Sequence, residues 1–197
     1  MSETAVRLHR KTRDDYRALP EGPPYYELID GELIEMTRPS ELHNEIALTL
    51  AEWWRAHLRT GVGGALSIEP NLYLPNLESV YHPDLAYIAP EQRSIRKRDG
   101  IYGVPQVICE ILSPSTASLD RSVKLNDYRR AGVPHVWLVD PVRPVLVQEF
   151  VLGESGAYSL HSSLTAPAEW EPAAFPGWTI SLAELDAAVA SVEEASE

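Results

Sequence analysis

The stretch VPQVICEILSPSTASLDRSVKLNDYRRAGVPHVWLVDP, residues 104–141, decides the fold. The apolar run Val107–Leu112 between two prolines is typical of a buried strand. A helix is predicted from about Leu119 to Ala131, where Gly132 ends it. A second apolar run, His135–Val139, follows directly. Strand, helix and strand with short links form a βαβ unit, so the two strands are predicted to be parallel neighbours with a right-handed crossover.

Glu110 is the unusual residue of this unit, because it lies in the middle of an apolar strand. A buried strand tolerates a carboxylate only if a cation, a metal ion or hydrogen bonds compensate its charge. Either Glu110 lies near an exposed strand end and has no role, or a partner for it comes from elsewhere in the chain.

Composition limits the possible classes of protein. The chain has 197 residues and a net charge of −12, which indicates one domain and argues against broad, sequence-independent adhesion to nucleic acid. No apolar run approaches the roughly 20 residues that span a bilayer, so no contact with a membrane is expected. The charged N-terminus does not resemble a secretory signal. Cys109 is the only cysteine, which fits a reducing compartment and predicts a cytoplasmic location.

The N-terminal half predicts a hairpin, a helix and two strands. Asp30-Gly31 within residues 25–36 favours a type I′ hairpin. A helix with one apolar face is expected from Pro39 or Ser40 to about Thr60. Residues 65–74 and 80–88 are each predicted to be a strand, the second with Pro83 marking an edge, a bulge or a break.

Residues 89–103 form the most basic patch of the chain and are expected to be a mobile loop. The cations there are Arg93, Arg96, Lys97 and Arg98. They either are simply solvated or contact phosphate groups. After Pro141, residues 145–152 and 157–160 predict a second hairpin, and a final helix is expected after Ser181.

Three ionisable residues suggest a site. Asp84 follows Pro83, Glu110 lies on the next strand, and Lys124 lies on the helix after it. Asp120, Lys124 and Tyr128 share one face of that helix at a spacing of four residues. The Asp120–Lys124 pair alone could also be a simple surface ion pair.

This pattern resembles the PD-(D/E)XK nuclease superfamily, and more closely its Uma-two family. Pro83-Asp84 and Glu110 match the two acidic motifs, and position 112, where the lysine normally falls, is Leu. Lys124 can replace that lysine from the helix. The words that match the Uma-two family are DGEL at 30–33, His43, PDLAYI at 83–88, EILSPST at 110–116, DxxxKxxxY at 120–128 and AGVPHVWLVDP at 131–141.

The resemblance implies an α/β (α+β) fold. Its core is a restriction-endonuclease-like mixed β-sheet flanked by helices, with extra N- and C-terminal strands. The match covers roughly residues 16–185, which leaves an N-terminal tail, residues 1–15, and an acidic C-terminal tail, residues 186–197.

The resemblance also implies a Mg²⁺- or Mn²⁺-dependent endonuclease that hydrolyses DNA. Asp84, Glu110 and the backbone carbonyl of Ile111 would hold the metal ion, and Lys124 would complete the catalytic set. The auxiliary residues would be Glu32, His43, Asp120 and Tyr128. A homodimer is expected by analogy of fold. The alternative is a catalytically inactive homodimeric interaction module, whereas a serine hydrolase is disfavoured because no G-x-S-x-G motif is present.

Overall fold

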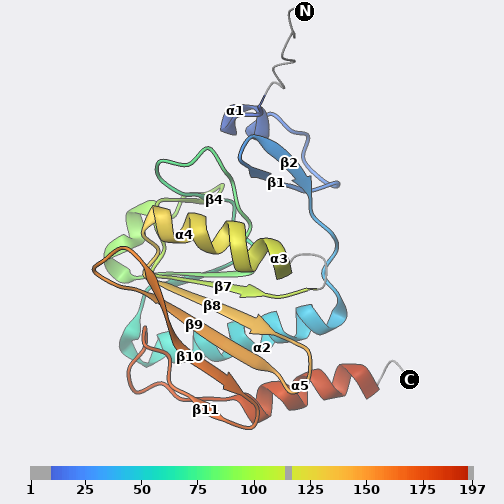
Figure 1. The fold of residues 1–197 in the computed structure, drawn as a ribbon, viewed down its shortest axis with the longest axis vertical. Helices are drawn as coiled ribbons and strands as arrows, with labels where there is room; N and C mark the ends of the chain where they lie inside the picture. Colours follow the sequence, from blue (N-terminus) through green and yellow to red (C-terminus); the bar gives the residue numbers. More distant parts are fainter. Residues whose placement is uncertain (1–9, 114–116, 195–197) are drawn as a thin grey trace, which may run out of the picture.

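The computed structural model describes residues 10–113 and 117–194 (Figure 1). Its centre is a six-stranded sheet in the order β10-β9-β8-β7-β5-β3. The strands are β3 Ala65–Ile68, β5 Leu85–Ile88, β7 Val107–Ile111, β8 His135–Asp140, β9 Leu146–Leu152 and β10 Tyr158–Thr165. The pair of β7 and β8 is parallel and the other neighbours are antiparallel, so the sheet is mixed, as predicted.

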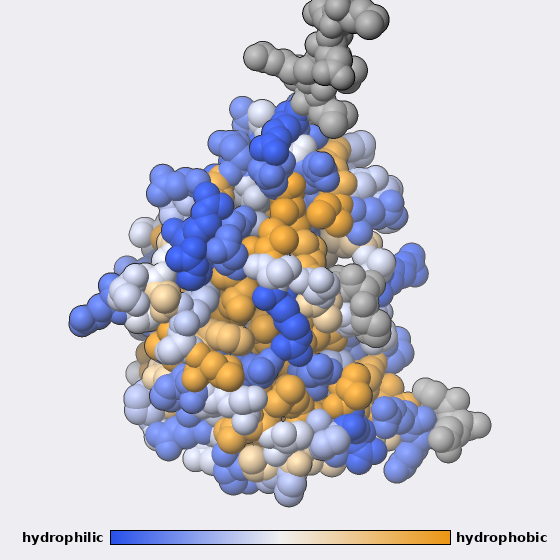
Figure 2. Space-filling model, viewed as in Figure 1, coloured by the Kyte–Doolittle hydropathy of each residue, from blue (hydrophilic) through white to orange (hydrophobic). Residues whose placement is uncertain are grey.

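Helices cover both faces of this sheet (Figure 1). On one face lie α2 Glu41–His57 and α5 Leu182–Glu194, whose side chains share a core with Trp137. On the other lie α3 Ala117–Leu119, a π-helical turn Asp120–Lys124 (η3) and α4 Leu125–Ala131. Gly132 ends α4 with φ 86°, and β7-helix-β8 is the predicted βαβ unit. In the same view, hydrophilic residues gather on the outer face of α4, and hydrophobic residues show beside it toward the β1–β2 hairpin (Figure 2).

The N-terminal part forms a separate small layer. It holds α1 Arg13–Arg17 and the antiparallel pair β1 Tyr26–Ile29 and β2 Glu32–Glu35. Asp30 and Gly31 at the turn have φ of 49° and 82°, the left-handed values that a type I′ turn requires. The pair is attached to the body by backbone hydrogen bonds between Leu28 and Val80.

Two predicted strands are interrupted where the sequence has proline. The prediction of one strand over residues 65–74 was wrong, because the chain turns at Glu69-Pro70, with Glu69 at φ 44°. The second part, β4 Leu72–Tyr73, pairs instead with β6 Ile101–Tyr102. Pro83 likewise breaks the run of residues 80–88, so Asp84 lies just before β5 and not within a strand.

The expected loop and tails are also more regular than predicted. Residues 89–103 contain a 3-10 helix, η2 Pro90–Ile95, and β6. The final helix continues to Glu194 and buries Val189, so a tail does not begin at residue 186. At the other end, Thr12 caps α1, so regular structure begins before residue 16, where the N-terminal tail was predicted to end. The remaining elements are a π-helical turn Leu58–Val62 (η1) and the short pair β11 Glu169–Trp170 and β12 Ile180–Ser181.

No helix among the described residues is long and apolar enough to cross a membrane.

Candidate active site

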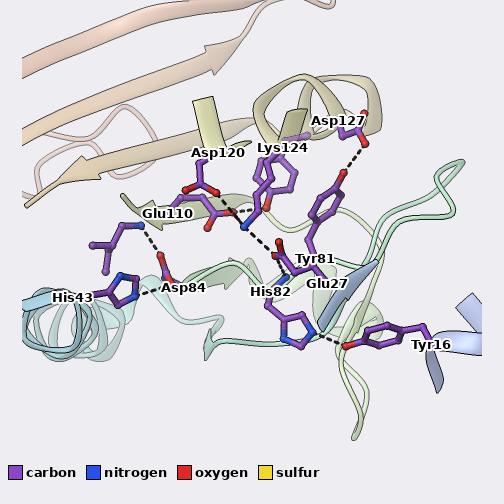
Figure 3. Close-up of polar contacts among 12 residues, drawn as sticks. Tyr16, Glu27, His43, Tyr81, His82, Asp84, Glu110, Asp120, Lys124 and Asp127 are labelled. Atoms are coloured by element: carbon purple, nitrogen blue, oxygen red, sulfur yellow. Dashed lines mark hydrogen bonds and ion pairs between the residues drawn. The ribbon is translucent and has the colours of Figure 1, made fainter. Parts of the chain in front are cut away.

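A cavity of about 390 Å³ lies at the end of β7, where the sheet meets the hairpin, α2 and η3. Asp84, Glu110 and Lys124 all line it, although 40 positions separate the first from the last in the sequence. The fold therefore brings the three residues of the predicted constellation together (Figure 3).

Lys124 lies at the centre of a cluster of carboxylates. Its Nζ atom is 3.0 Å from Glu27 Oε1, 3.2 Å from Asp120 Oδ1 and 3.5 Å from Glu110 Oε1. Its side chain is only 6% exposed. Burial alone would lower the pKa of Lys124, but the charges of Glu110, Glu27 and Asp120 outweigh burial and raise it. The ammonium is therefore charged at neutral pH.

The π-helical turn explains how Asp120 and Lys124 reach this cluster. Both residues are buried at its two ends and form an ion pair four residues apart. Such wide turns inside helices are frequent at functional sites. The prediction that this pair could be a surface ion pair is wrong, because both side chains are nearly inaccessible.

Glu110 projects from β7 into the same cluster. Its Oε1 atom accepts a hydrogen bond from the Tyr128 hydroxyl on α4 and faces Lys124. Burial raises the pKa of Glu110 well above its usual range, and the nearby acids Asp120, Asp84 and Glu27 raise it further against the effect of Lys124. Glu110 is thus not at an exposed strand end, and the neighbouring donors do not fully compensate the charge of its carboxylate.

Asp84 is held by a different pair of donors. Its Oδ2 atom accepts a 2.5 Å hydrogen bond from the Ile111 N–H, and its Oδ1 atom lies 3.0 Å from His43 Nε2 (Figure 3). Burial lowers the pKa of His43, but the hydrogen bond and charge of Asp84 outweigh burial and raise it. His43 lies in the first turn of α2, where its backbone N–H donates to the cap residue Ser40.

The hairpin supplies Glu27, which the sequence analysis missed, and not Glu32. Glu32 is exposed on β2 and does not line the cavity, so the prediction for it was wrong. Glu27 is buried on β1 and accepts a hydrogen bond from the His82 backbone N–H as well as facing Lys124. The pattern that drew attention to Glu110, an acid inside an apolar strand, is also present in Tyr26–Ile29 and could have identified Glu27.

His82 is a second residue of the cavity that was missed. Its Nε2 atom lies 2.6 Å from the hydroxyl of Tyr16 on α1. Burial lowers the pKa of His82 to about 4, and the positive charge of Lys124 adds to the effect. His82 is therefore neutral at neutral pH. Nothing in the local sequence indicates this, because Tyr16 approaches from outside the sheet.

The predicted basic patch lies outside the cavity. Arg96, Lys97 and Arg98 line an adjoining hollow, whereas Arg93 is exposed on η2 and lines neither.

Within the described residues, no three His, Cys, Asp or Glu side chains form a group that could hold a metal ion by themselves. The available donors are the hard carboxylate oxygens of Asp84 and Glu110 and the carbonyl of Ile111. Mg²⁺ is commonly bound by one or two carboxylates, with water and substrate phosphate oxygens completing its coordination. The donor set fits that mode of binding, and the surplus of acids around a single ammonium favours an added cation.

The fold is shared with a solved structure. The structure resembles the crystal structure of a "putative nuclease belonging to DUF820" from Anabaena variabilis, with a TM-score of 0.72 and 19% identity. The similarity covers 90% of this chain and 98% of that one, and it establishes a common fold.

The particular family follows from the sequence. Residues 13–183 match the Uma2 family, described as "Putative restriction endonuclease", so the chain belongs to that family. A relative in Synechocystis sp., "Uncharacterized protein sll1609", is 27% identical over 103 residues. That match covers 52% of this chain and 58% of the relative, so the chain spans little more than half the length of the relative.

Proposed function

We propose that the protein is a Mg²⁺- or Mn²⁺-dependent endonuclease that hydrolyses phosphodiester bonds of DNA in the cavity around Lys124. The observation that carries this proposal is the convergence of Asp84, Glu110 and Lys124 on one cavity. Lys124, although displaced from the usual motif position, lies 3.5 Å from Glu110. Membership of the Uma2 family supports the same class of reaction.

Asp84, Glu110 and the Ile111 carbonyl would hold the metal ion. When bound, such an ion polarises the scissile phosphate and lowers the pKa of a coordinated water molecule. The Ile111 N–H and His43 hold the Asp84 carboxylate from two sides. The Tyr128 hydroxyl holds the Glu110 carboxylate by a hydrogen bond.

Lys124 would stabilise the negative charge that develops on the phosphate. Its raised pKa keeps it protonated, so it acts as an electrostatic group and hydrogen-bond donor and not as a general base. Glu27 and Asp120 hold the ammonium in place through ion pairs of 3.0 and 3.2 Å. Both are positioning residues in this scheme, because they act through Lys124.

A cleavage assay tests the proposal. Single-stranded, double-stranded and branched DNA are incubated with Mg²⁺ or Mn²⁺ and with wild-type protein, Glu110→Gln or Lys124→Met. Metal-dependent product is expected from the wild type, and far less is expected from the variants. The absence of product from every substrate, with folded protein, would favour the non-catalytic interaction module instead.

The homodimer remains a prediction. Light scattering of the purified protein measures its mass directly, and a monomer at the assay concentration would contradict it.

A further inference from the structure

Some cationic side chains of this chain form ion pairs within the protein, and others do not. Arg10, Arg121, Arg130 and Arg143, for example, form ion pairs with Asp30, Asp140, Asp127 and Asp186. In contrast, several exposed cations have no ion pair or side-chain hydrogen bond with any other residue that the structure describes, and four of these lie close together. They are Arg55, Arg96, Lys97 and Arg98.

These four side chains line one hollow of about 530 Å³. Arg55 comes from the last turns of α2, and the other three come from the turn between η2 and β6, some 40 residues later. Glu69 lines this hollow and also the cavity of the candidate active site, so the two depressions adjoin. We call the hollow lined by the four cations the basic groove.

The backbone of the basic groove is held in place. The Lys97 N–H donates to the Gly100 carbonyl at 2.8 Å, and Asn71 Nδ2 donates to the Asp99 carbonyl at 3.0 Å. A Cβ atom on Gly100 would lie 2.4 Å from the carbonyl oxygen of Asn71, so only glycine permits this approach. The three cations of the turn therefore extend from a fixed backbone, which a mobile loop would not provide.

The charge balance of the groove is opposite to that of the protein. Its acidic residues are Glu69 and Asp99, and Asp99 already accepts a hydrogen bond from the Tyr102 hydroxyl. Four cations against two acids form a locally positive surface on a chain of net charge −12. Unpaired arginines suit phosphate groups, because the guanidinium group donates two parallel hydrogen bonds.

We propose that the basic groove binds the phosphates of DNA that flank the scissile bond. The groove would position the strand so that the next phosphate enters the cavity past Glu69. The role in flanking the scissile bond rests on the proposed nuclease function, whereas the binding of DNA phosphates does not.

Arg93 offers a matched control. It belongs to the same basic stretch of sequence and is exposed, but it does not line the groove. If the net charge of the stretch were responsible for binding, Arg93→Ala and Arg96→Ala would have equal effects. If the groove is responsible, Arg96→Ala and Arg55→Ala weaken binding and Arg93→Ala does not.

The experiment measures binding of labelled single-stranded and duplex DNA by fluorescence anisotropy in EDTA, over a series of NaCl concentrations. Each groove variant is expected to weaken binding and to reduce the slope of log K against log salt. The reduction is about 0.9 per side chain on duplex and about 0.7 on a single strand. Arg93→Ala is expected to leave both the affinity and the slope unchanged. Melting temperatures verify that all variants are folded.

An unchanged affinity after replacement of all four cations by alanine would overturn the proposal, as would equal effects of Arg93→Ala and Arg96→Ala. A wild type that binds through the groove but cleaves no DNA with Mg²⁺ would refute the nuclease and support the groove. A wild type that cleaves DNA, with a KM that is unchanged by the four replacements, would support the nuclease and refute the groove.

Discussion

Glu149 and Glu110 are both buried in the central sheet, on opposite faces and among different neighbours. The Glu149 carboxylate accepts hydrogen bonds from the indole N–H groups of Trp137 and Trp170 and from the Ala173 N–H, at 3.0–3.4 Å. Burial alone would raise the pKa of Glu149, but the adjacent His135 and these donors outweigh burial and lower it. The charge is therefore satisfied by the protein itself.

Glu110 has the opposite surroundings. Its donors are the Tyr128 hydroxyl and Lys124, and Lys124 is shared with Glu27 and Asp120. The pKa of Glu110 is raised by burial and by the neighbouring acids. The Glu149 carboxylate has its own N–H donors, whereas three carboxylates of the other cluster share the single ammonium of Lys124. This difference separates a structural glutamate from a candidate metal-binding glutamate.

Replacing Lys124 by Met should have the largest effect. Metal-dependent cleavage is expected to fall by about 10²–10³, because an electrostatic donor is lost. The free energy of unfolding is expected to fall by about 3–5 kcal/mol at neutral pH, because the buried acids lose their cation. Urea unfolding and the cleavage assay measure the two effects. Lys11→Met, at an exposed position, is the control, and an equal loss there would contradict the prediction.

Replacing Glu149 by Ala should affect only stability. Two buried indole N–H groups and the partly buried Ala173 N–H would lose their acceptor, at a cost of about 3 kcal/mol in the free energy of unfolding. In EDTA, Glu110→Gln should change the free energy of unfolding by about 1 kcal/mol or less, because the charge of the Glu110 carboxylate is poorly compensated without a metal ion. Urea unfolding compares the two variants, with Glu154→Ala at an exposed turn as the control. A larger loss of stability in Glu110→Gln than in Glu149→Ala would contradict the prediction.

The two glutamates should also respond oppositely to pH. Glu149 has a lowered pKa, so its stabilisation is present above its unfolded value of about 4.3 and is lost as the pH falls through the folded value. Glu110 has a raised pKa, so the stabilisation that its bound proton provides is present below about pH 4.3 and is lost as the pH rises through the folded value.

Urea unfolding of wild type, Glu149→Gln and Glu110→Gln in EDTA over a range of pH measures this difference. The advantage of wild type over Glu149→Gln should shrink in acid. The stability of wild type relative to Glu110→Gln should instead decline as the pH rises. Parallel pH profiles for the two variants would show that the surroundings of the two glutamates are equivalent.

The smallest expected effect is stabilisation by metal. Mg²⁺ or Mn²⁺ at a few times its dissociation constant should stabilise the protein by about 1 kcal/mol, which raises the melting temperature by about 2–4 °C at this chain length. Asp84→Asn should abolish the increase, and Glu32→Gln, at an exposed acid of the hairpin, should retain it. Equal increases in both variants would place the metal elsewhere.

The sequence pattern does not distinguish Glu110 from Glu149. Each is a single acid within an apolar strand, VICEI in one and LVQEFVL in the other. Only Glu110 was singled out, because it lies in the middle of the first apolar strand of the βαβ unit. The donors that satisfy Glu149 come from β8 and from residues 170–173, which local periodicity does not connect with it.

By itself, the sequence determined the elements and much of their order. Apolar periodicity, the Asp30-Gly31 turn and Gly132 are local features, and local backbone preferences are sufficient to predict the hairpin, α2 and the βαβ unit. The pairing of β4 with β6, the entry of Glu27 in place of Glu32, and the adjoining basic groove were decided only by tertiary structure. The reason is that burial and electrostatic contacts depend on the distance between side chains in space, which the spacing of residues along the chain does not specify.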